Sequence, residues 1–122
     1  MCSSDLIPAK FPKLRWAFVE ASAEWIPFAL NDLGIRLKRQ GKRLPKTILR
    51  DNNMYVTCLV TDTLDYILKF AGDGQLVVGT DYGHADNSAE IEAIRKLKDD
   101  GSLPAGVADK ILDDNARALY GL

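Results

Sequence analysis

The sequence predicts an α/β fold in which three short parallel strands alternate with helices. Apolar runs of strand length begin near residues 14, 54 and 75, and each is followed by a segment whose apolar residues recur at helical spacing. The strand runs are apolar on successive residues, which is typical of strands buried on both faces of a parallel sheet. Such strands are joined by right-handed crossovers. Three strands make a small sheet with both edges open, so we expect the chain to be part of something larger.

The composition is that of a small globular protein, and it excludes several classes of function. The chain has 122 residues, 47% of them hydrophobic and 27% charged, and is therefore about one domain long. Its 16 basic and 17 acidic side chains give a net charge of −1, so we expect neither nucleic acid nor a membrane as a partner. No signal peptide is visible, and we expect a cytoplasmic protein. The cysteines Cys2 and Cys58 cannot form a disulfide framework, and the single histidine, His84, excludes a multi-histidine metal site within this chain.

Residues 1–6 fit no structural pattern. The run Cys-Ser-Ser-Asp-Leu is also the translation of the common sequencing-adapter end TGCTCTTCCGATCT in one reading frame. We therefore expect this segment to be an adapter scar, with a natural disordered terminus as the alternative. In the first case the natural protein extends upstream, and residues 7–122 are the C-terminal portion of a larger domain.

The first strand and helix cover residues 14–41. Residues 14–20 have the length of a buried strand. The next helix carries Pro27 near its first turn, where the missing N–H costs nothing, and it ends at Gly41. Residues at helical spacing along it are Trp25, Phe28, Ala29, Leu33 and Leu37. We expect the aromatic rings of Trp16, Trp25 and Phe28 to lie in the core, and the five basic residues of 36–43 to form a solvated helix end rather than a phosphate site.

The second unit begins after a basic, irregular segment, residues 42–53, with a helical turn near residues 47–50. Residues 54–60 are rich in strand formers, and Cys58 within them is expected to be an unreactive core thiol. Thr61 or Asp62 can cap a helix. That helix carries Leu64, Ile67, Leu68 and Ala71 and is closed by Gly72 and Gly74.

The third unit starts with a strand at residues 75–79. Asn87 and Glu90 have capping-box spacing, and the helix behind them is expected to end at Gly101 after burying Ile91, Ile94 and Leu97. A last helix starts near Pro104, buries Val107, Ile111 and Leu112, and runs to Tyr120.

Candidate chemistry lies where the strands end, because α/β folds place their active sites at the carboxyl ends of parallel strands. The places are residues 20–24, 60–62 and 80–86. The third is the densest, with Thr80, Asp81, Tyr82, His84 and Asp86 around Gly83. A carboxylate at Asp81 can bind a divalent metal or manage the proton of a metal-bound water, and His84 can support it. The alternatives are a turn-forming Asp and a hydrogen-bonding surface His.

Three segments resemble the amidohydrolase-related family, the metal-dependent hydrolases and decarboxylases grouped with aminocarboxymuconate-semialdehyde decarboxylase. Residues 76–86, Leu-Val-Val-Gly-Thr-Asp-Tyr-Gly-His-Ala-Asp, resemble the family's last barrel strand, usually G-T-D-[YW]-P-H-x-D. Residues 11–15 and 19–27 resemble an earlier strand with its acidic turn and W-x-P helix start, and residues 111–120 resemble the closing I-L-x-x-N-A-x-x-L-Y helix. Gly83 replaces the usual proline. Glu20 stands where members often have histidine, although many relatives have glutamate there.

The resemblance implies that residues 7–122 are the last three βα units of a TIM-type (β/α)8 barrel. It implies that Asp81 is a metal ligand and catalytic residue and that His84 supports it. We expect Glu20 and Tyr82 to contact substrate, and the departure at Glu20 leaves metal binding and a structural role as alternatives for that position. The metal is expected to be zinc, and the family's His-x-His and further lone His ligands have no counterpart in this chain.

The resemblance also implies an activity for the intact protein. We expect metal-activated water to attack an ester, amide or lactone carbonyl of a small-molecule substrate. A metal-dependent non-oxidative decarboxylase of the same family is one alternative, and a small non-catalytic α/β binding module is another. The chain alone is expected to be inactive and to be poorly folded or self-associating, because three barrel strands leave two edges unpaired. Self-association of this kind would give a homo-oligomer.

Overall fold

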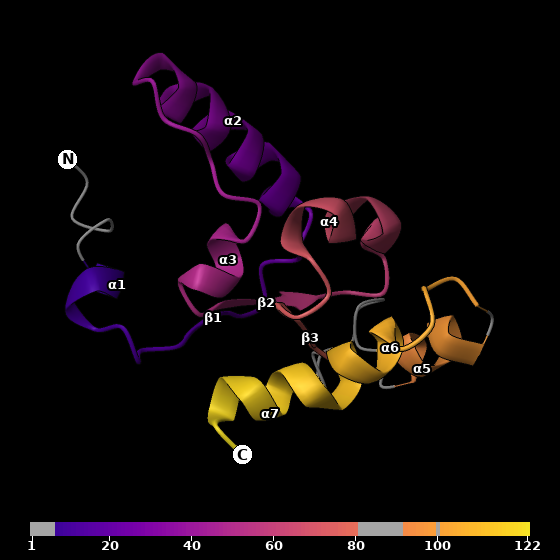
Figure 1. Ribbon diagram of the computed structural model, residues 1–122. Coiled ribbons are helices and arrows are strands. Elements are labelled where there is room, and N and C mark those ends of the chain that lie inside the picture. Colours follow the sequence, from indigo (N-terminus) through magenta and orange to yellow (C-terminus); the bar gives the residue numbers. More distant parts are fainter. Residues whose placement is uncertain (1–6, 81–91, 100) are drawn as a thin grey trace.

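Three parallel strands form the centre of the fold (Figure 1). Strands β1 (Trp16–Phe18), β2 (Met54–Cys58) and β3 (Leu76–Val78) lie side by side in the order β1-β2-β3. Phe18 is paired with Val56, and Cys58 with Val78, both in parallel register. The computed structural model describes residues 7–80, 92–99 and 101–122, and within them the predicted parallel strand order is confirmed.

Helical segments connect the strands and flank the sheet. In chain order they are α1 (Ile7–Lys10), α2 (Trp25–Arg39), α3 (Ile48–Asp51), α4 (Leu64–Ala71), α5 (Ala93–Asp99), α6 (Val107–Asp109), the π-helical turn η2 (Lys110–Asp114) and α7 (Asn115–Tyr120). In Figure 1, α2, α3 and α4 lie above the strands, and α6 and α7 lie below them.

One core joins the sheet to these helices. In the parallel register, Val56, Cys58 and Leu76 share a face, and all three are fully buried. Ile26 of α2, Ile67 of α4 and Ile111 of η2 complete the set of fully buried large side chains and belong to the same apolar cluster. Burial of one such side chain contributes roughly 1.5–3 kcal/mol. The helical spacing read from residues 64–71 is confirmed, since Leu64, Ile67 and Ala71 are all buried.

A buried amide fixes the C-terminal helix to the sheet. The side-chain N–H groups of Asn115 donate to the carbonyls of Leu76 (2.7 Å) and Asp73 (2.8 Å). Lys110 forms an ion pair with Asp73 at 2.7 Å, and its ammonium group holds the pKa of that carboxyl below the usual range. Both contacts anchor the segment from η2 to α7 at the start of β3. The expected burial of Val107 and Ile111 is confirmed, and Leu112 is half-buried.

The first strand and its helix are more exposed than the sequence predicted. β1 is an edge strand three residues long, and Phe18 and Val19 are 40% and 67% exposed. Phe28, expected in the core, is 77% exposed. The reason is geometric: Phe28 lies in the same first turn of α2 as the buried Ile26 and Pro27, but on the side of the helix opposite Ile26, which no other described element covers. Trp25 is half-buried and packs edge-to-face on Phe18, with ring centroids 5.5 Å apart.

The helix caps also differ from those that the sequence predicted. The N-cap of α4 is Thr63, and its side chain makes no capping bond, whereas Asp62 bonds to a loop far away in the sequence. The helix expected before Gly101 is present as α5, and Gly101 has the positive φ (73°) that suits a residue just after a helix. Asn87, Glu90 and Ile91 lie outside the described residues.

Candidate functional site

Three loops meet at the carboxyl ends of the strands. We call them the strand-end loops: residues 19–24 after β1, residues 59–63 after β2, and residues 79–80 after β3, as far as that loop is described. Parallel strands bring such loops to one edge of the sheet. Glu20 lies in the first loop. The other predicted site residues, Asp81, Tyr82 and His84, lie outside the described residues, as does Asp86.

Thr57, in β2, connects the ends of all three strands. Its Oγ1 accepts a hydrogen bond from the Glu20 N–H at 3.0 Å and donates one to the Phe18 carbonyl at 3.3 Å. A single hydroxyl can do both. Gly79, just after β3, also lies against Thr57. A Cβ added to Gly79 would lie 3.3 Å from the Thr57 Cβ, so a side chain at position 79 would crowd Thr57. Thr57 therefore ties the end of β1 to β2, and the missing side chain of Gly79 lets the chain after β3 lie close to Thr57.

The backbone of the first strand-end loop is strained at two positions. Glu20 and Ser22 have φ values of 64° and 54°, in the left-handed region that non-glycine residues seldom adopt. Each such residue costs roughly 1–2 kcal/mol. The carboxylate of Glu20 makes no hydrogen bond or ion pair with another described residue, and the side chain is exposed. Strain of this kind persists where surrounding contacts enforce it, and it clusters at functional sites.

A buried carboxylate joins the first two strand-end loops. Asp62 is only 8% exposed, and it accepts hydrogen bonds from the Ser22 hydroxyl (2.6 Å), the Ala23 N–H (2.8 Å) and the Leu59 N–H (2.9 Å). A second carboxylate bonds in the opposite direction between the same two loops. Glu24 in the first loop accepts a hydrogen bond from the Thr63 N–H in the second at 2.5 Å. Asp62 is thus a structural clamp whose two oxygens are already engaged.

Cys58 is not available for chemistry. It is fully buried, and its thiol donates to the Val77 carbonyl at 3.5 Å. Burial, reinforced by the nearby negative charge of Asp62, raises the pKa of the Cys58 thiol from 9.0 to about 12. Because the thiolate is the nucleophile and metal ligand, a thiol held neutral is inert. This agrees with the core role expected for it.

The described residues alone do not make a metal centre. No group of three or more His, Cys, Asp or Glu side chains within them is placed to hold a metal ion. Among the described residues of the strand-end loops, Asp62 and Glu24 are engaged and the adjoining Cys58 is protonated, which leaves Glu20 as the carboxylate free to meet a ligand. A metal would therefore need donors from outside this part of the chain.

Sequence reasoning missed Thr57, and it named Asp62 as a helix cap and as part of the candidate site at residues 60–62 without predicting that it joins two loops. Thr57 is a polar residue within the apolar run 54–60, a signal that could have marked it. The role of Asp62 had no such signal, because its partners Ser22 and Ala23 are 40 and 39 residues away in the sequence.

Comparison with known proteins identifies the fold. The structure of an amidohydrolase from Mycobacterium avium subsp. paratuberculosis K-10 superposes on 96% of this chain with a TM-score of 0.75 and 20% sequence identity. The chain spans 30% of that protein's length. No protein-family model matches the sequence, and no curated protein does. Among the described helices, none is long and apolar enough to cross a membrane. The chain thus has the fold of one part of an amidohydrolase.

Proposed function

We propose that this chain supplies part of the catalytic face of a metal-dependent hydrolase of the amidohydrolase superfamily. The observation that carries the proposal is the convergence of the strand-end loops, with a strained Glu20 held at the carboxyl end of β2 by Thr57. Active sites of α/β barrels lie at this end of the strands. The likeness to an amidohydrolase over 96% of the chain is consistent with residues 7–122 being the last three βα units of such a barrel.

The proposal gives each residue a task. Asp81 follows β3 by three residues and would act as a ligand to a zinc ion and hold the proton of the attacking water, with His84 in support. Glu20 and Tyr82 would contact the substrate. A zinc ion supplies a water that ionises near neutral pH and polarises a carbonyl. Thr57 and Asp62 would hold the first strand-end loop in place, so that the Glu20 carboxylate faces the substrate.

The substrate class follows from that chemistry. An ester, an amide or a lactone has a carbonyl carbon that an activated water can attack, so we assign hydrolysis of a small molecule of this kind. A carboxy-lyase would use the same residues on an unsaturated acid and would release carbon dioxide instead.

The test compares isosteric substitutions in a longer polypeptide. Residues 7–122 would be fused behind the corresponding amino-terminal part of the Mycobacterium avium amidohydrolase. Asp81→Asn is expected to lower the rate of hydrolysis at least about 100-fold, the usual contribution of a group that moves a proton in the transition state. Asp65→Asn, on the exposed face of α4, removes the same charge and serves as the matched control.

Each outcome has a clear meaning. Equal rates for the two variants would contradict the role of Asp81. Release of carbon dioxide from an unsaturated acid, with no hydrolysis of an ester, amide or lactone panel, would favour the carboxy-lyase.

A further inference from the structure

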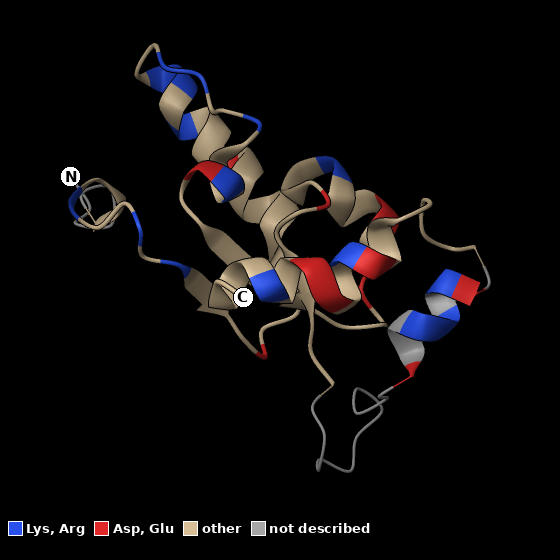
Figure 2. Cartoon of the chain, turned by 60° about the horizontal axis from the view of Figure 1, so that its bottom comes forward, with Lys and Arg blue, Asp and Glu red and all other residues tan. Residues whose placement is uncertain are grey.

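Two pairs of adjacent basic residues lie close together where α2 ends, and their surroundings differ. Lys38 and Arg39 belong to the last turn of α2, whereas Lys42 and Arg43 belong to the connection between α2 and α3, residues 40–47. Figure 2 shows the basic residues gathered at this end of α2 and along the segment that follows. Both pairs are a lysine followed by an arginine, so a difference in their reactivity has to come from the backbone.

The backbone of the first pair is held in the helix. The Gln40 N–H donates to the Leu37 carbonyl at 2.9 Å, and the Gly41 N–H donates to the Lys38 carbonyl at 3.0 Å. Endoproteases bind their substrates as extended strands. A peptide bond in this turn can therefore reach a protease only after the turn has unwound.

The backbone of the second pair is irregular and exposed. Lys42, Arg43 and Pro45 are exposed, and residues 42–45 belong to no helix, strand or turn. The N–H and C=O groups of Arg43 and Leu44 make no hydrogen bond with another described residue. A proline disfavours the helical conformation for the residue before it, so Pro45 keeps Leu44 extended. Exposed segments of this kind are where folded proteins are cut.

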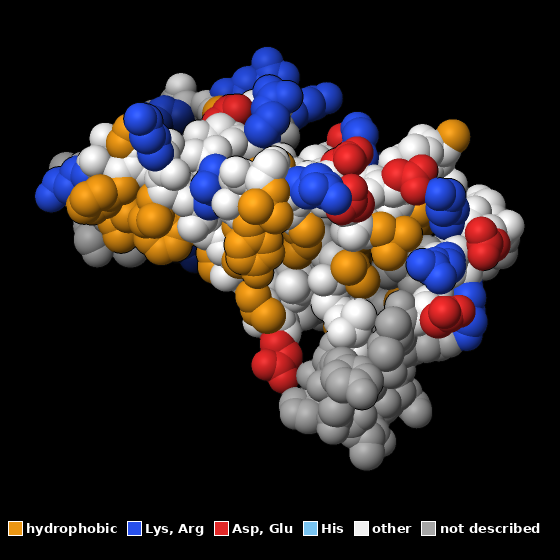
Figure 3. Space-filling model, turned by 90° about the horizontal axis from the view of Figure 1, so that it is seen from below, with side chains coloured by type: hydrophobic (Ala, Val, Ile, Leu, Met, Phe, Trp, Pro, Cys, Tyr) orange, Lys and Arg blue, Asp and Glu red, His pale blue; other side chains and the backbone are white. Residues whose placement is uncertain are grey.

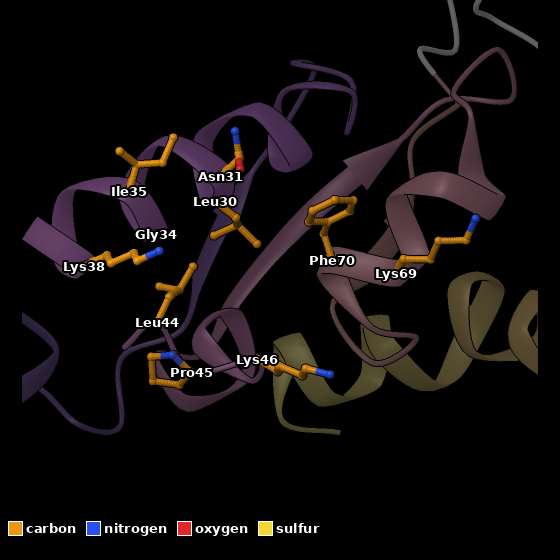
Figure 4. Close-up of a pocket in the computed structure, with 10 residues that line it drawn as sticks. All are labelled: Leu30, Asn31, Gly34, Ile35, Lys38, Leu44, Pro45, Lys46, Lys69 and Phe70. Atoms are coloured by element: carbon orange, nitrogen blue, oxygen red, sulfur yellow. The ribbon is translucent and has the colours of Figure 1, made fainter. Parts of the chain in front are cut away.

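Two contacts hold the connection against α2. Leu44 is half-buried and points towards α2, as Figure 4 shows, and a Cβ added to Gly34 would lie 3.8 Å from it. Upstream, the Lys42 N–H donates to the Leu37 carbonyl at 2.9 Å. Neither Leu44 nor Lys42 belongs to the apolar cluster of the core. The connection can therefore open locally while the sheet and its helices stay folded.

We infer that the Lys42-Arg43 pair is a processing site for a serine endoprotease whose primary pocket holds a carboxylate, and that the two pieces of the cut chain stay associated. The protease takes Lys42 or Arg43 in that pocket, and water hydrolyses the peptide bond that follows. The C–N bond breaks, the carbonyl carbon takes the oxygen of the water and becomes a carboxylate, and the released nitrogen takes both protons and becomes an ammonium group. The inference does not rest on the proposed hydrolase activity.

The association of the two pieces follows from bonds that cross the cut. β1 pairs with β2, and the Thr57 hydroxyl in the second piece accepts a hydrogen bond from the Glu20 N–H in the first. Asp62 in the second piece accepts hydrogen bonds from Ser22 and Ala23 in the first. A cut within the connection removes none of these bonds.

The test is a brief digestion of the 122-residue chain with a trace of trypsin, a serine endoprotease of this kind, followed by mass spectrometry of the denatured pieces. We expect cutting after Lys42 or Arg43 to be at least about tenfold faster than cutting after Lys38 or Arg39, because the helical turn has to unwind first. Cuts ahead of β1 only shorten the N-terminal segment and are scored separately. Under native conditions, size-exclusion chromatography should show the two pieces in one peak.

Matched variants separate the backbone from the charge. The double variant Lys42→Gln and Arg43→Gln should leave residues 16–58 in one piece over the same time of digestion. The control, Lys38→Gln and Arg39→Gln, removes the same charge and should be cut as the unaltered chain is. Leu44→Ala removes the contact with α2 and should speed the cut.

Three outcomes would overturn the inference. Equal rates of cutting at the two basic pairs would show that the backbone does not distinguish them. A first cut between β1 and β2 at any other residue would place the site elsewhere. Separation of the two pieces on the column would contradict their association.

Discussion

Thr57 and Asp62 hold together the loops on which the proposed activity depends. Thr57 bonds to the backbone of Glu20 and Phe18, and Asp62 accepts three bonds from two loops. These contacts offset the unfavourable φ angles of Glu20 and Ser22. A hydrogen bond to a charged group contributes about 1.5–3 kcal/mol, and a buried donor left without a partner costs about 1–3 kcal/mol.

Asp62→Asn is therefore expected to destabilise the fold. The amide replaces one acceptor oxygen with an NH2 group that would face other donors, so we expect a loss of about 2–4 kcal/mol in the free energy of unfolding. Urea denaturation followed by circular dichroism measures it. Asp65→Asn, at an exposed position, should change that free energy by no more than about 0.5 kcal/mol. Equal effects of the two substitutions would contradict the clamp.

The raised pKa of Cys58 predicts a loss of stability at high pH. Above pH 9.0 the thiol of the unfolded chain ionises, while the folded thiol keeps its proton up to about pH 12. The unfolded state then binds fewer protons, so the free energy of unfolding falls by about 1.4 kcal/mol per pH unit in this range and is unaffected below it. Because other groups titrate there too, the measurement is the difference between the chain and its Cys58→Ala variant from pH 8 to 10.5. A constant difference would show that the Cys58 pKa is not raised by folding.

At the scale of elements, the sequence patterns predicted local structure well and long-range placement less well. Residues 64–71 formed the expected helix with the expected buried side, because a short helix with one apolar stripe has one way to pack. Residues 25–39 also formed a helix, yet Phe28 is exposed, since helical spacing does not show which side of a helix its neighbours cover. The three strands are shorter than predicted because pairing with a neighbour, rather than composition, sets where a strand ends. Glu20 was found as a site residue by its position after β1, whereas the bonds that fix it come from Thr57 in another strand.

Two glycines of the α2 region are expected to respond in opposite ways to alanine. Gly34 lies within α2, and its added Cβ would make an ordinary 3.8 Å contact with Leu44, so Gly34→Ala should stabilise the fold by roughly 0.5–1 kcal/mol. Gly41 follows the helix with a φ of 70° and has open space around it. Gly41→Ala should therefore destabilise by about 1 kcal/mol from backbone strain alone. Thermal unfolding of both variants gives the comparison, and stabilisation by both would contradict the left-handed turn after α2.

At the scale of the whole molecule, the fold leaves apolar side chains on its surface. Figure 3 shows a band of hydrophobic side chains across one face. Large apolar residues that are exposed include Phe11, Leu14, Phe18, Val19, Phe28, Tyr120 and Leu122. Phe18 and Val19 lie at β1, an edge strand with one partner among the described strands. An apolar edge strand is a template for pairing with another chain.

We therefore expect the 122-residue chain to self-associate through the edge of β1. Sedimentation velocity should show an average mass that rises above 13.5 kDa with protein concentration. Val19→Lys places a charge at that edge and should keep the mass near the monomer value over the same range. Gln40→Lys, which adds the same charge at the exposed end of α2, is the matched control. Association of the Val19→Lys variant as strong as that of the unaltered chain would place the contact elsewhere.

We propose that this chain forms part of the catalytic face of a metal-dependent hydrolase. The most direct test measures hydrolysis by the longer polypeptide that carries residues 7–122, before and after treatment with a chelator and again after addition of zinc. We predict that the chelator abolishes hydrolysis, that zinc restores it, and that the Asp81→Asn variant stays at least about 100-fold slower after zinc is added. A rate that the chelator does not change would contradict the claim.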